Sequence, residues 1–246
     1  MVVPDLQVPL HDQEFVEKLI EVAARTKLDG LLFIGDLTDS TEVSRWVKGK
    51  PGEFTGNLQD AFDQTRSIVR RFRAAVGDEC EMILQDSNHD ERTMKYVEQY
   101  APALASLRSL DLGSLVGLDS YSVGFVSGAY EFLPGVKSMH GHERPYTQVP
   151  GRWGMLRVIE HGTHIVYGHT HTPNLTISAQ GTGEGRRNLW SMNVGHGMDM
   201  EKAEYLQDGY ATWAQAFGMI THDGVNAHPE LIVSQGGNFV FDGSVW

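Results

Sequence analysis

The stretch LLFIGDLTD, residues 31–39, decides the fold, because four apolar residues turn directly into a glycine and two closely spaced carboxylates. An apolar run of this length that ends in a polar turn is typical of a buried strand. Three further apolar runs lead into polar residues in the same way: residues 82–84 before Asn88, 136–139 before His140 and 165–167 before His169. The sequence therefore predicts four buried strands that present polar side chains at their carboxyl ends.

Helical patterns alternate with these strands. One apolar stripe contains Leu58, Phe62, Thr65, Val69 and Phe72, and an earlier stripe contains Phe15, Leu19, Val22 and Ala23. Both stripes follow the three- and four-residue steps of a helix with one buried face. The intervening Arg70, Arg71 and Arg73 predict a solvated charged face, with a nucleic-acid contact as the lesser alternative. Alternating strands and helices predict a layered α/β fold that binds ligands beyond the carboxyl ends of its strands.

The chain changes texture from about Leu175 onward. Short alternating runs with glycine punctuation cover residues 188–194, 210–220 and 231–233, and they predict a second β-sheet. Residues 180–188 contain three glycines and predict a hairpin tip, and residues 48–56 predict an irregular loop beside the site. No stretch has the composition of a linker, so we expect a single domain over residues 1–246.

Composition limits the classes of function. The chain has 246 residues, a formal charge of −12 and one cysteine, Cys80, which excludes an internal disulfide and a cysteine-rich zinc cluster. The charge argues against a protein that coats nucleic acid, although metal ions in an acidic cleft can still attract phosphate. Pro4 and Asp5 interrupt the start of the chain before an apolar leader could form, and no stretch reaches membrane-spanning length. We expect a soluble cytoplasmic protein with no membrane partner.

Metal-ligating residue types gather at the predicted strand ends. Seven of the eleven histidines fall between His140 and His196. Two neighbouring divalent ions need a bridging carboxylate with oxygen and imidazole ligands on either side. The chain supplies such donors in order: Asp5, Asp36 and Asp39, Asn88 to Asp90, His140, and His169 with His171. This order predicts a two-metal site.

The same segments resemble the calcineurin-like metallophosphoesterase superfamily, whose pattern reads D-x-H, G-D-x-x-D, G-N-H-[DE], H and G-H-x-H. The matching segments are Asp5-Leu6-Gln7, Gly35-Asp36-Leu37-Thr38-Asp39, Ser87-Asn88-His89-Asp90, His140, and Gly168-His169-Thr170-His171. Five pieces in order at strand ends make a specific signal. The neighbourhood of residues 88–92, with Tyr96 and Ala101-Pro102, is similar to phage-encoded members, for which the compartment would be the host cytoplasm. The resemblance implies a four-layer α/β/β/α sandwich of two mixed sheets flanked by helices.

The resemblance also implies roles for individual residues. One ion would be held by Asp5, Asp36 and His171, and the other by Asp36, Asn88, His140 and His169. Asp36 would bridge the two ions, and a water between them would attack phosphorus in line. His89 would act as the general acid that protonates the leaving oxygen, oriented by Asp39. Arg92 either neutralises phosphate charge as a bidentate donor or faces solvent.

Two positions depart from the superfamily pattern. Gln7 replaces an imidazole, and its carbonyl oxygen is a harder and weaker ligand that favours Mn²⁺ or Mg²⁺ over Zn²⁺ at the Asp5 metal. We therefore expect two divalent ions, with Mn²⁺ first and Mg²⁺, iron, Ni²⁺ or Zn²⁺ as alternatives, and partial occupancy on the Asp5 side. Ser87 replaces a glycine and requires either a less strained turn or a local adjustment there. Only Met1 to Pro4 are available for the strand before Asp5, which is short but permissible.

Most other histidines have a structural explanation. A histidine outside the motifs is more often a hydrogen-bonded polar group than a ligand. This applies to His11, His142, His161, His164, His196, His222 and His228. His142 could compete with His140 for the metal, but His140 follows the apolar strand directly and is followed by Gly141.

The motifs favour hydrolysis of a phosphate ester. We interpret the chain as a phosphodiesterase that acts on nucleic acid or a cyclic nucleotide. A phosphomonoesterase or protein phosphatase is the nearest alternative, but Ser40 and Thr41 follow Asp39 where protein phosphatases have Arg-Gly. A non-catalytic metal-binding scaffold is the alternative from another class, and the weakened Gln7 position keeps it open. The oligomeric state stays undetermined.

Overall fold

A computed structural model describes residues 1–44, 56–145, 147, 149–202 and 212–246. Its larger sheet has the strand order β11-β10-β1-β2-β3-β4. Strands β1 to β4 run parallel, whereas β10 pairs antiparallel with β1 and β11 pairs antiparallel with β10. The bounds are β1 Val2–Val3, β2 Gly30–Phe33, β3 Glu81–Gln85, β4 Val123–Val126, β10 Ala216–His222 and β11 Ala227–Val233.

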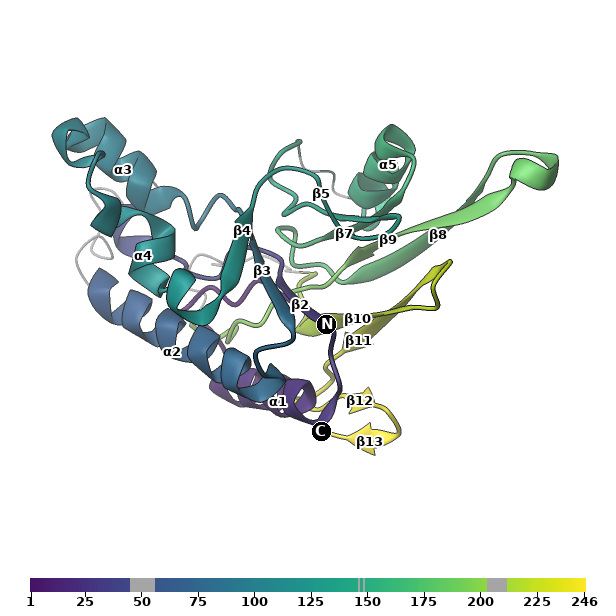
Figure 1. Ribbon diagram of the computed structural model, residues 1–246, viewed down its shortest axis with the longest axis horizontal. Coiled ribbons are helices and arrows are strands. Elements are labelled where there is room, and N and C mark those ends of the chain that lie inside the picture. Colours follow the sequence, from purple (N-terminus) through teal and green to yellow (C-terminus); the bar gives the residue numbers. More distant parts are fainter. Residues whose placement is uncertain (45–55, 146, 148, 203–211) are drawn as a thin grey trace.

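The second sheet has the order β5-β6-β7-β9-β8. Strands β6, β7 and β9 run parallel, and the flanking β5 and β8 are antiparallel to their neighbours. The bounds are β5 Tyr130–Leu133, β6 Val136–Ser138, β7 His164–Tyr167, β8 Asn174–Gln180 and β9 Arg187–Asn193. The β8–β9 hairpin extends beyond the body of the molecule at the right of Figure 1. A small separate ribbon pairs β12 Val240–Phe241 with β13 Ser244–Val245.

Three apolar clusters show the order of the layers. Between the sheets, Leu32 and Ile34 of the first sheet pack in one cluster with Val166 and Met192 of the second. Helices α1 Gln13–Arg25 and α2 Leu58–Val76 cover the other face of the first sheet, where Phe33 and Phe72 meet edge to face. Helix α5 Arg152–His161 covers the outer face of the second sheet (Figure 1). The predicted α/β/β/α sandwich of two mixed sheets is confirmed.

The two long helices form where the periodicity predicts them. Both begin at a residue whose side chain caps the first turn: Asp12 accepts from the Phe15 amide, and Asn57 accepts from the Gln59 amide. The predicted stripe residues from Phe62 to Phe72 are all buried. The remaining helical segments are α3 Arg92–Tyr100, α4 Leu112–Val116, and the single turns Thr41–Val43, Pro102–Leu104, Arg108–Leu110, Asp119–Tyr121 and Gly183–Gly185.

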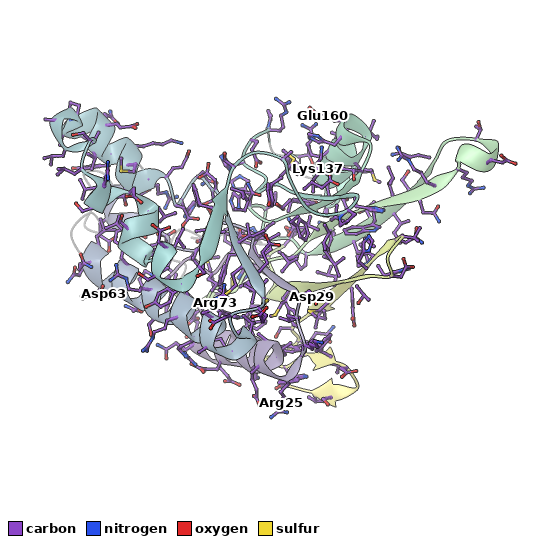
Figure 2. All side chains as sticks on the ribbon, in the orientation of Figure 1. Arg25, Asp29, Asp63, Arg73, Lys137 and Glu160 are labelled. Carbon is purple, nitrogen blue, oxygen red and sulfur yellow. The ribbon has the colours of Figure 1, made fainter. Side chains whose placement is uncertain are left out.

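Arg73 contradicts the prediction of a solvated arginine face on α2. It is only 9% exposed, and its guanidinium donates to the carbonyl oxygens of Gly77, Cys80, Tyr121 and Ser122. Figure 2 labels this side chain at the carboxyl-terminal half of α2. A guanidinium has five N–H donors and can satisfy several backbone carbonyl oxygens at once. Arg73 therefore connects α2 to the segments that lead into β3 and β4.

The strands after Leu175 also differ from the prediction. The four long strands do not pair into one sheet: β8 and β9 join β7, whereas β10 and β11 extend the first sheet beside β1, and only the short β12 and β13 make a ribbon of their own among the described residues. The alternating pattern identifies half-buried strands but does not identify their partners. Part of the predicted strand at 210–220, residues 210–211, and most of the predicted loop at 48–56, residues 48–55, lie outside the described residues. None of the helices in the described ranges has the length and apolar character needed to cross a membrane.

Candidate metal centre

The candidate ligands converge at one edge of the two facing sheets. Parallel strands end at a common edge, so residues that follow them become neighbours although they are far apart in sequence. Asp5 follows β1, Asp36 follows β2, Asn88 follows β3, His140 follows β6, and His169 and His171 follow β7. All five strands predicted to deliver these residues are present.

The first donor group contains Asp5, Asp36 and His171. One ligand atom from each lies within 4.8 Å of the others, and all three residues are buried. His171 Nε2 lies 3.1 Å from Asp5 Oδ2, which also accepts a hydrogen bond from the His169 amide at 2.7 Å. The backbone of one predicted ligand thus fixes the carboxylate of another.

The second donor group contains Asp36, His140 and His169, again with ligand atoms within 4.8 Å of one another. His140 is fully buried, and its Nδ1 lies 2.9 Å from the Ile34 carbonyl oxygen. Because a carbonyl can only accept, Nδ1 carries a proton, and Nε2, 3.1 Å from Asp36 Oδ1, is the atom that becomes a ligand once it loses its own proton. Asp36 belongs to both groups, which is the position of a bridging ligand.

The backbone at these ligands is held in an uncommon conformation. Gln7, Asp36, His169 and His171 all have a positive φ, between 46° and 62°. Residues other than glycine seldom adopt this left-handed conformation, and such residues cluster where a site imposes them. Gly168 shows how tightly the segments approach, because a Cβ there would lie 2.2 Å from Asp5 Oδ1. The G-H-x-H segment therefore needs its glycine to pass over Asp5.

Gln7 lies beside the first donor group. Its side-chain Nε2 donates to Asp36 Oδ2 at 3.3 Å and lies 3.3 Å from His171 Nε2. The amide thus presents its NH₂ group, rather than the expected carbonyl oxygen, to the carboxylate. Rotation of the amide by a half-turn exchanges the two atoms, so Gln7 can either donate to Asp36 or offer Oε1 to a cation.

Burial and mutual attraction shift the pKa values of these groups in opposite directions. Burial raises the pKa of Asp5 to about 8, even though the neighbouring His140 acts against this shift. Burial alone would lower the pKa of His140, but Asp36 and Asp5 outweigh it and raise that pKa to about 10. Burial lowers the pKa values of His169 and His171 to about 3. Without a metal the cluster holds a protonated Asp5 and a charged His140 at neutral pH, whereas His169 and His171 are already neutral donors.

His89 does not lie in either donor group but contacts their shared carboxylate. Its Nδ1 lies 2.8 Å from Asp39 Oδ1, and its backbone amide donates to Asp36 Oδ1 at 3.2 Å. The structure thus brings together His89 and Asp39, which sequence patterns predict to act as a pair. Burial opposes ionisation of Asp39, but the hydrogen bond and charge of His89 prevail and lower the pKa of that carboxyl.

Arg92 points at His89 and does not face solvent. Its Nη1 donates to the Asp39 carbonyl oxygen at 2.7 Å, and its Nη2 lies 2.7 Å from His89 Nε2. A guanidinium has no acceptor, so Nε2 accepts this bond and Nδ1 carries the proton toward Asp39. Arg92 therefore covers the nitrogen from which His89 would deliver a proton.

Three buried or half-buried polar residues that the sequence patterns missed hold the ligand loops in place. Asp90 accepts from the Leu37 and Thr38 amides and from Ser87 Oγ, which joins the loops after β2 and β3. Glu143 accepts from the amides of His140 and Gly141. Asn193 donates to the Gly168 carbonyl oxygen. Asp90 is part of the matched motif, but the motif does not show that it supports the loop after β2, and no pattern marks Glu143 or Asn193.

Ser87 also has a structural explanation. It is fully buried, and its hydroxyl donates to Asp90 Oδ2 at 2.7 Å. It has no positive φ, so the turn before Asn88 needs no glycine here. The predicted, less strained turn is confirmed.

The histidines outside the motifs fall into two kinds. His164 accepts from the Trp190 amide and His228 pairs with Asp223, as expected of hydrogen-bonded polar groups. In four others one buried ring nitrogen has no partner among the described residues: His11 Nδ1, His142 Nδ1, His196 Nε2 and His222 Nε2. His196 Nδ1 nevertheless accepts from the Met198 amide. His196 is fully buried, and its ring lies 5.4 Å from that of His171. His142, the alternative metal ligand to His140, lies outside both donor groups, whereas His140 belongs to the second group.

The donor set fits divalent cations. Within the described part of the chain, Asp5 Oδ1 and Asn88 Oδ1 are buried and have no hydrogen-bond partner. An unpaired buried oxygen is costly, and a cation that it coordinates removes the cost. Two imidazoles and an amide oxygen around a shared carboxylate form a mixed N/O set that suits first-row divalent ions.

Comparisons with known proteins give relatives over the whole chain. No family model matches. The chain is 33% identical over 251 residues to the gene 54 protein of Mycobacterium phage L5, covering 100% of this chain and 97% of that protein. It is 32% identical over 249 residues to the gene 54 protein of Mycobacterium phage D29, with the same coverage of both chains.

Solved structures give a looser likeness. Wild-type Vps29 from Entamoeba histolytica, complexed with Zn²⁺, aligns over 100% of this chain and 94% of its own, with a TM-score of 0.46 and 12% identity. Vacuolar protein sorting 29 from Cryptosporidium parvum aligns over 99% and 92%, with a TM-score of 0.43 and 15% identity. On its sequence identity over their full length, the protein belongs to the family of the mycobacteriophage gene 54 proteins.

Proposed function

We propose that the protein is a binuclear metal-dependent phosphodiesterase of the calcineurin-like metallophosphoesterase type. The observation that carries the proposal is the position of Asp36, which belongs to two metal-ligand groups and also contacts His89. A shared carboxylate supports a pair of ions, and an imidazole beside it supports acid catalysis at the same phosphate. We further propose that residues 1–246 form one domain that carries this activity.

The residues assigned to the ions divide as their geometry suggests. Asp5, Asp36 and His171 would hold one ion, with Gln7 beside it, and Asp36, Asn88, His140 and His169 would hold the other. Bound Mn²⁺ or another divalent ion would neutralise phosphate charge and lower the pKa of water. The Ile34 carbonyl oxygen holds the proton on His140 Nδ1, so that Nε2 would be the ligand atom after it loses its proton to make room for the ion.

His89 would protonate the departing oxygen, with Arg92 controlling when it can do so. Asp39 holds Nδ1, so only Nε2 can face the substrate. Arg92 covers Nε2 in the free protein, and a phosphate oxygen is a stronger acceptor for a guanidinium than an imidazole is. On substrate binding Arg92 would turn from His89 to the phosphate, which frees Nε2 to carry a proton. Arg92 thus acquires both a substrate-binding and a positioning role.

A phosphodiester of nucleic acid or of a cyclic nucleotide is the substrate class that we propose. The formal charge of −12 leaves recognition to the cations and to local groups such as Arg92. The relatives are encoded by mycobacteriophages, and we propose the host cytoplasm as the compartment.

The experiment compares bis-p-nitrophenyl phosphate with p-nitrophenyl phosphate as substrates in the presence of Mn²⁺. We expect faster turnover of the diester, and a loss of about 10² to 10⁴ in kcat for His89→Ala, the usual contribution of a general acid. The His228→Ala variant is the matched control, because His228 is exposed and pairs only with Asp223. Preferred turnover of the monoester would favour the phosphatase alternative, and full activity of His89→Ala would remove the proposed acid.

One observation favours a second candidate, a metal-binding scaffold without catalysis. The Gln7 amide donates to Asp36, so it can partly neutralise this carboxylate without a cation in the first group. A protein that retains one ion could keep the fold and lose hydrolysis. Bound metal without turnover of either nitrophenyl ester, with any divalent ion, would support the scaffold.

A further inference from the structure

Helix α3 carries two exposed tyrosines, Tyr96 and Tyr100, that the proposed chemistry does not use. Together with Arg92 they form a row along the helix that we call the α3 stripe. Arg92, Tyr96 and Tyr100 are spaced by four residues and therefore follow one another along one side of the helix. Tyr96 is 41% exposed and Tyr100 is 48% exposed, and their ring centroids lie 4.7 Å apart at an interplanar angle of 47°. Tyrosines supply large flat contact surfaces, and an exposed pair of them marks a surface suited to an aromatic ligand.

The stripe begins inside the candidate metal centre. Arg92, its first member, contacts both His89 and Asp39. With a helical rise of about 1.5 Å per residue, Tyr96 lies roughly 6 Å and Tyr100 roughly 12 Å further along the helix axis. Figure 1 shows α3 extending from the loop after β3 away from both sheets. The tyrosines therefore lie on a path that leads outward from the phosphate position.

We propose that Tyr96 and Tyr100 are a stacking platform for nucleobases, and that the substrate is single-stranded nucleic acid. The inference rests on the proposed function, because it places the scissile phosphodiester at Arg92 and the bases next to it on the tyrosines. Aromatic side chains stack on any base, so the platform selects for unpaired bases rather than for a sequence. Bases inside a duplex are already stacked on their neighbours, so double-stranded substrates gain nothing from it.

The acidic charge of the protein favours base stacking, rather than phosphate contacts, as the main source of affinity for nucleic acid. The chain as a whole is acidic, and the stripe contributes one arginine. The neighbouring Lys95 is paired with Glu91, so it offers little net attraction. Proteins that make many phosphate contacts lose affinity steeply with salt, whereas one or two cations cause a shallow dependence. Binding through the platform should therefore fall less than about ten-fold between about 50 and 200 mM salt.

The test measures the Kd of a fluorescent eight-nucleotide oligothymidylate by anisotropy, with Mn²⁺ present and with the His89→Ala background to prevent turnover. We expect the Kd to rise roughly five-fold or more for Tyr96→Ala and for Tyr100→Ala, and less than about two-fold for Tyr96→Phe and Tyr100→Phe. Ile177→Ala removes an apolar side chain on β8 of the other sheet that is 64% exposed, more than either tyrosine, and should leave the Kd unchanged. Steady-state kinetics on the His89-containing protein should show a higher KM for the two alanine variants, with kcat changed less.

Each outcome decides one of the two proposals. Tyrosine-dependent binding supports the platform whether or not the oligonucleotide is cleaved, and binding without cleavage counts only against the phosphodiesterase. Hydrolysis of the nitrophenyl diester without tyrosine-dependent binding overturns the platform and leaves the phosphodiesterase standing. Equal affinity for a duplex, a steep salt dependence or no oligonucleotide binding also overturns the platform. In the last case the stripe would serve a protein partner instead.

Discussion

The two halves of the candidate metal centre share Asp36 but differ in their other donors. One side contains His140 and His169. We assign Asn88 to this side from its motif position, and its Oδ1 is buried and unpaired within the described part of the chain. On the other side Asp5 and His171 stand with Gln7, whose NH₂ group reaches Asp36. On the His140 side a cation must displace the proton that His140 Nε2 shares with Asp36, whereas on the Gln7 side it must displace both the proton of Asp5 and the hydrogen bond from Gln7 to Asp36. Two donor groups with similar geometry can therefore have unequal affinities for a metal ion, because their ligand atoms make different hydrogen bonds in the metal-free protein.

Replacement of the shared ligand, Asp36, should weaken metal binding in both halves and so abolish the difference between them. Asp36→Asn takes the bridging charge from both halves, so we expect both ions to be lost and phosphodiester turnover to fall by more than about 100-fold, beyond the usual effect of a supporting residue. Metal analysis of the purified variant, together with a diester assay, measures both quantities. Two retained ions in Asp36→Asn would contradict a bridging role.

Removal of one imidazole from each half, in two separate variants, should show how far the two halves differ in metal affinity. We expect His140→Ala to weaken the tighter ion and to cost more activity than His171→Ala, which affects the half that already competes with Gln7. Removal of a metal ligand should lower the metal affinity by more than the roughly 10- to 100-fold that is usual when a residue that only supports a ligand is replaced. Titration of each variant with Mn²⁺ by calorimetry gives the affinities, and equal losses in the two variants would show that the halves are equivalent.

The dependence of metal binding on pH should also distinguish the halves. Asp5, with a pKa of about 8, must lose a proton to bind one ion, and His140, with a pKa of about 10, must lose one to bind the other. Both affinities should rise with pH by up to about ten-fold per unit, and the rise should level off near pH 8 only for the Asp5 half. Calorimetry in buffers of different ionisation enthalpy counts the protons released. Affinities that fall with pH would contradict these protonation states.

The metal-free protein should respond to pH in the opposite sense at Asp5. The pKa of Asp5 is higher in the folded protein, about 8, than the ordinary value of 3.8 for an aspartate side chain. The folded state therefore binds the proton more tightly, and this contribution to stability is lost as pH rises from about 4 to about 8. Thermal unfolding of the metal-free protein and of Asp5→Asn should show a smaller loss in the variant over this range.

Restoration of the imidazole at position 7 should narrow the difference between the halves. Gln7→His supplies a better ligand for first-row divalent ions, so we expect the weaker ion to bind about ten-fold more tightly while the tighter ion changes little. Gln7→Glu is a useful companion, because it keeps the shape and supplies an anionic oxygen. Unchanged occupancy in both variants would mean that Gln7 does not limit the Asp5 half.

The sequence predicts the site better than it predicts the sheets. The order of the motifs places Asp36, His140 and His169 at strand ends, and the structure brings these residues together because parallel strands end at one edge. The division of the last four long strands between two sheets is not predictable from alternation, which reports the buried face and not the neighbour. Long-range contacts decide the rest. Arg73 is buried against the Tyr121 and Ser122 carbonyl oxygens. Arg92 is held by the Asp39 carbonyl oxygen, and Gln7 is oriented by Asp36.

Anomalous diffraction at the manganese absorption edge, on crystals grown with Mn²⁺, tests the two-metal account most directly. We predict two peaks on either side of Asp36, with the weaker peak beside Asp5, His171 and Gln7. Gln7→His should bring the two peaks closer to equal height. The absence of a peak between Asp36, His140 and His169, or a peak remote from Asp36, would contradict the account.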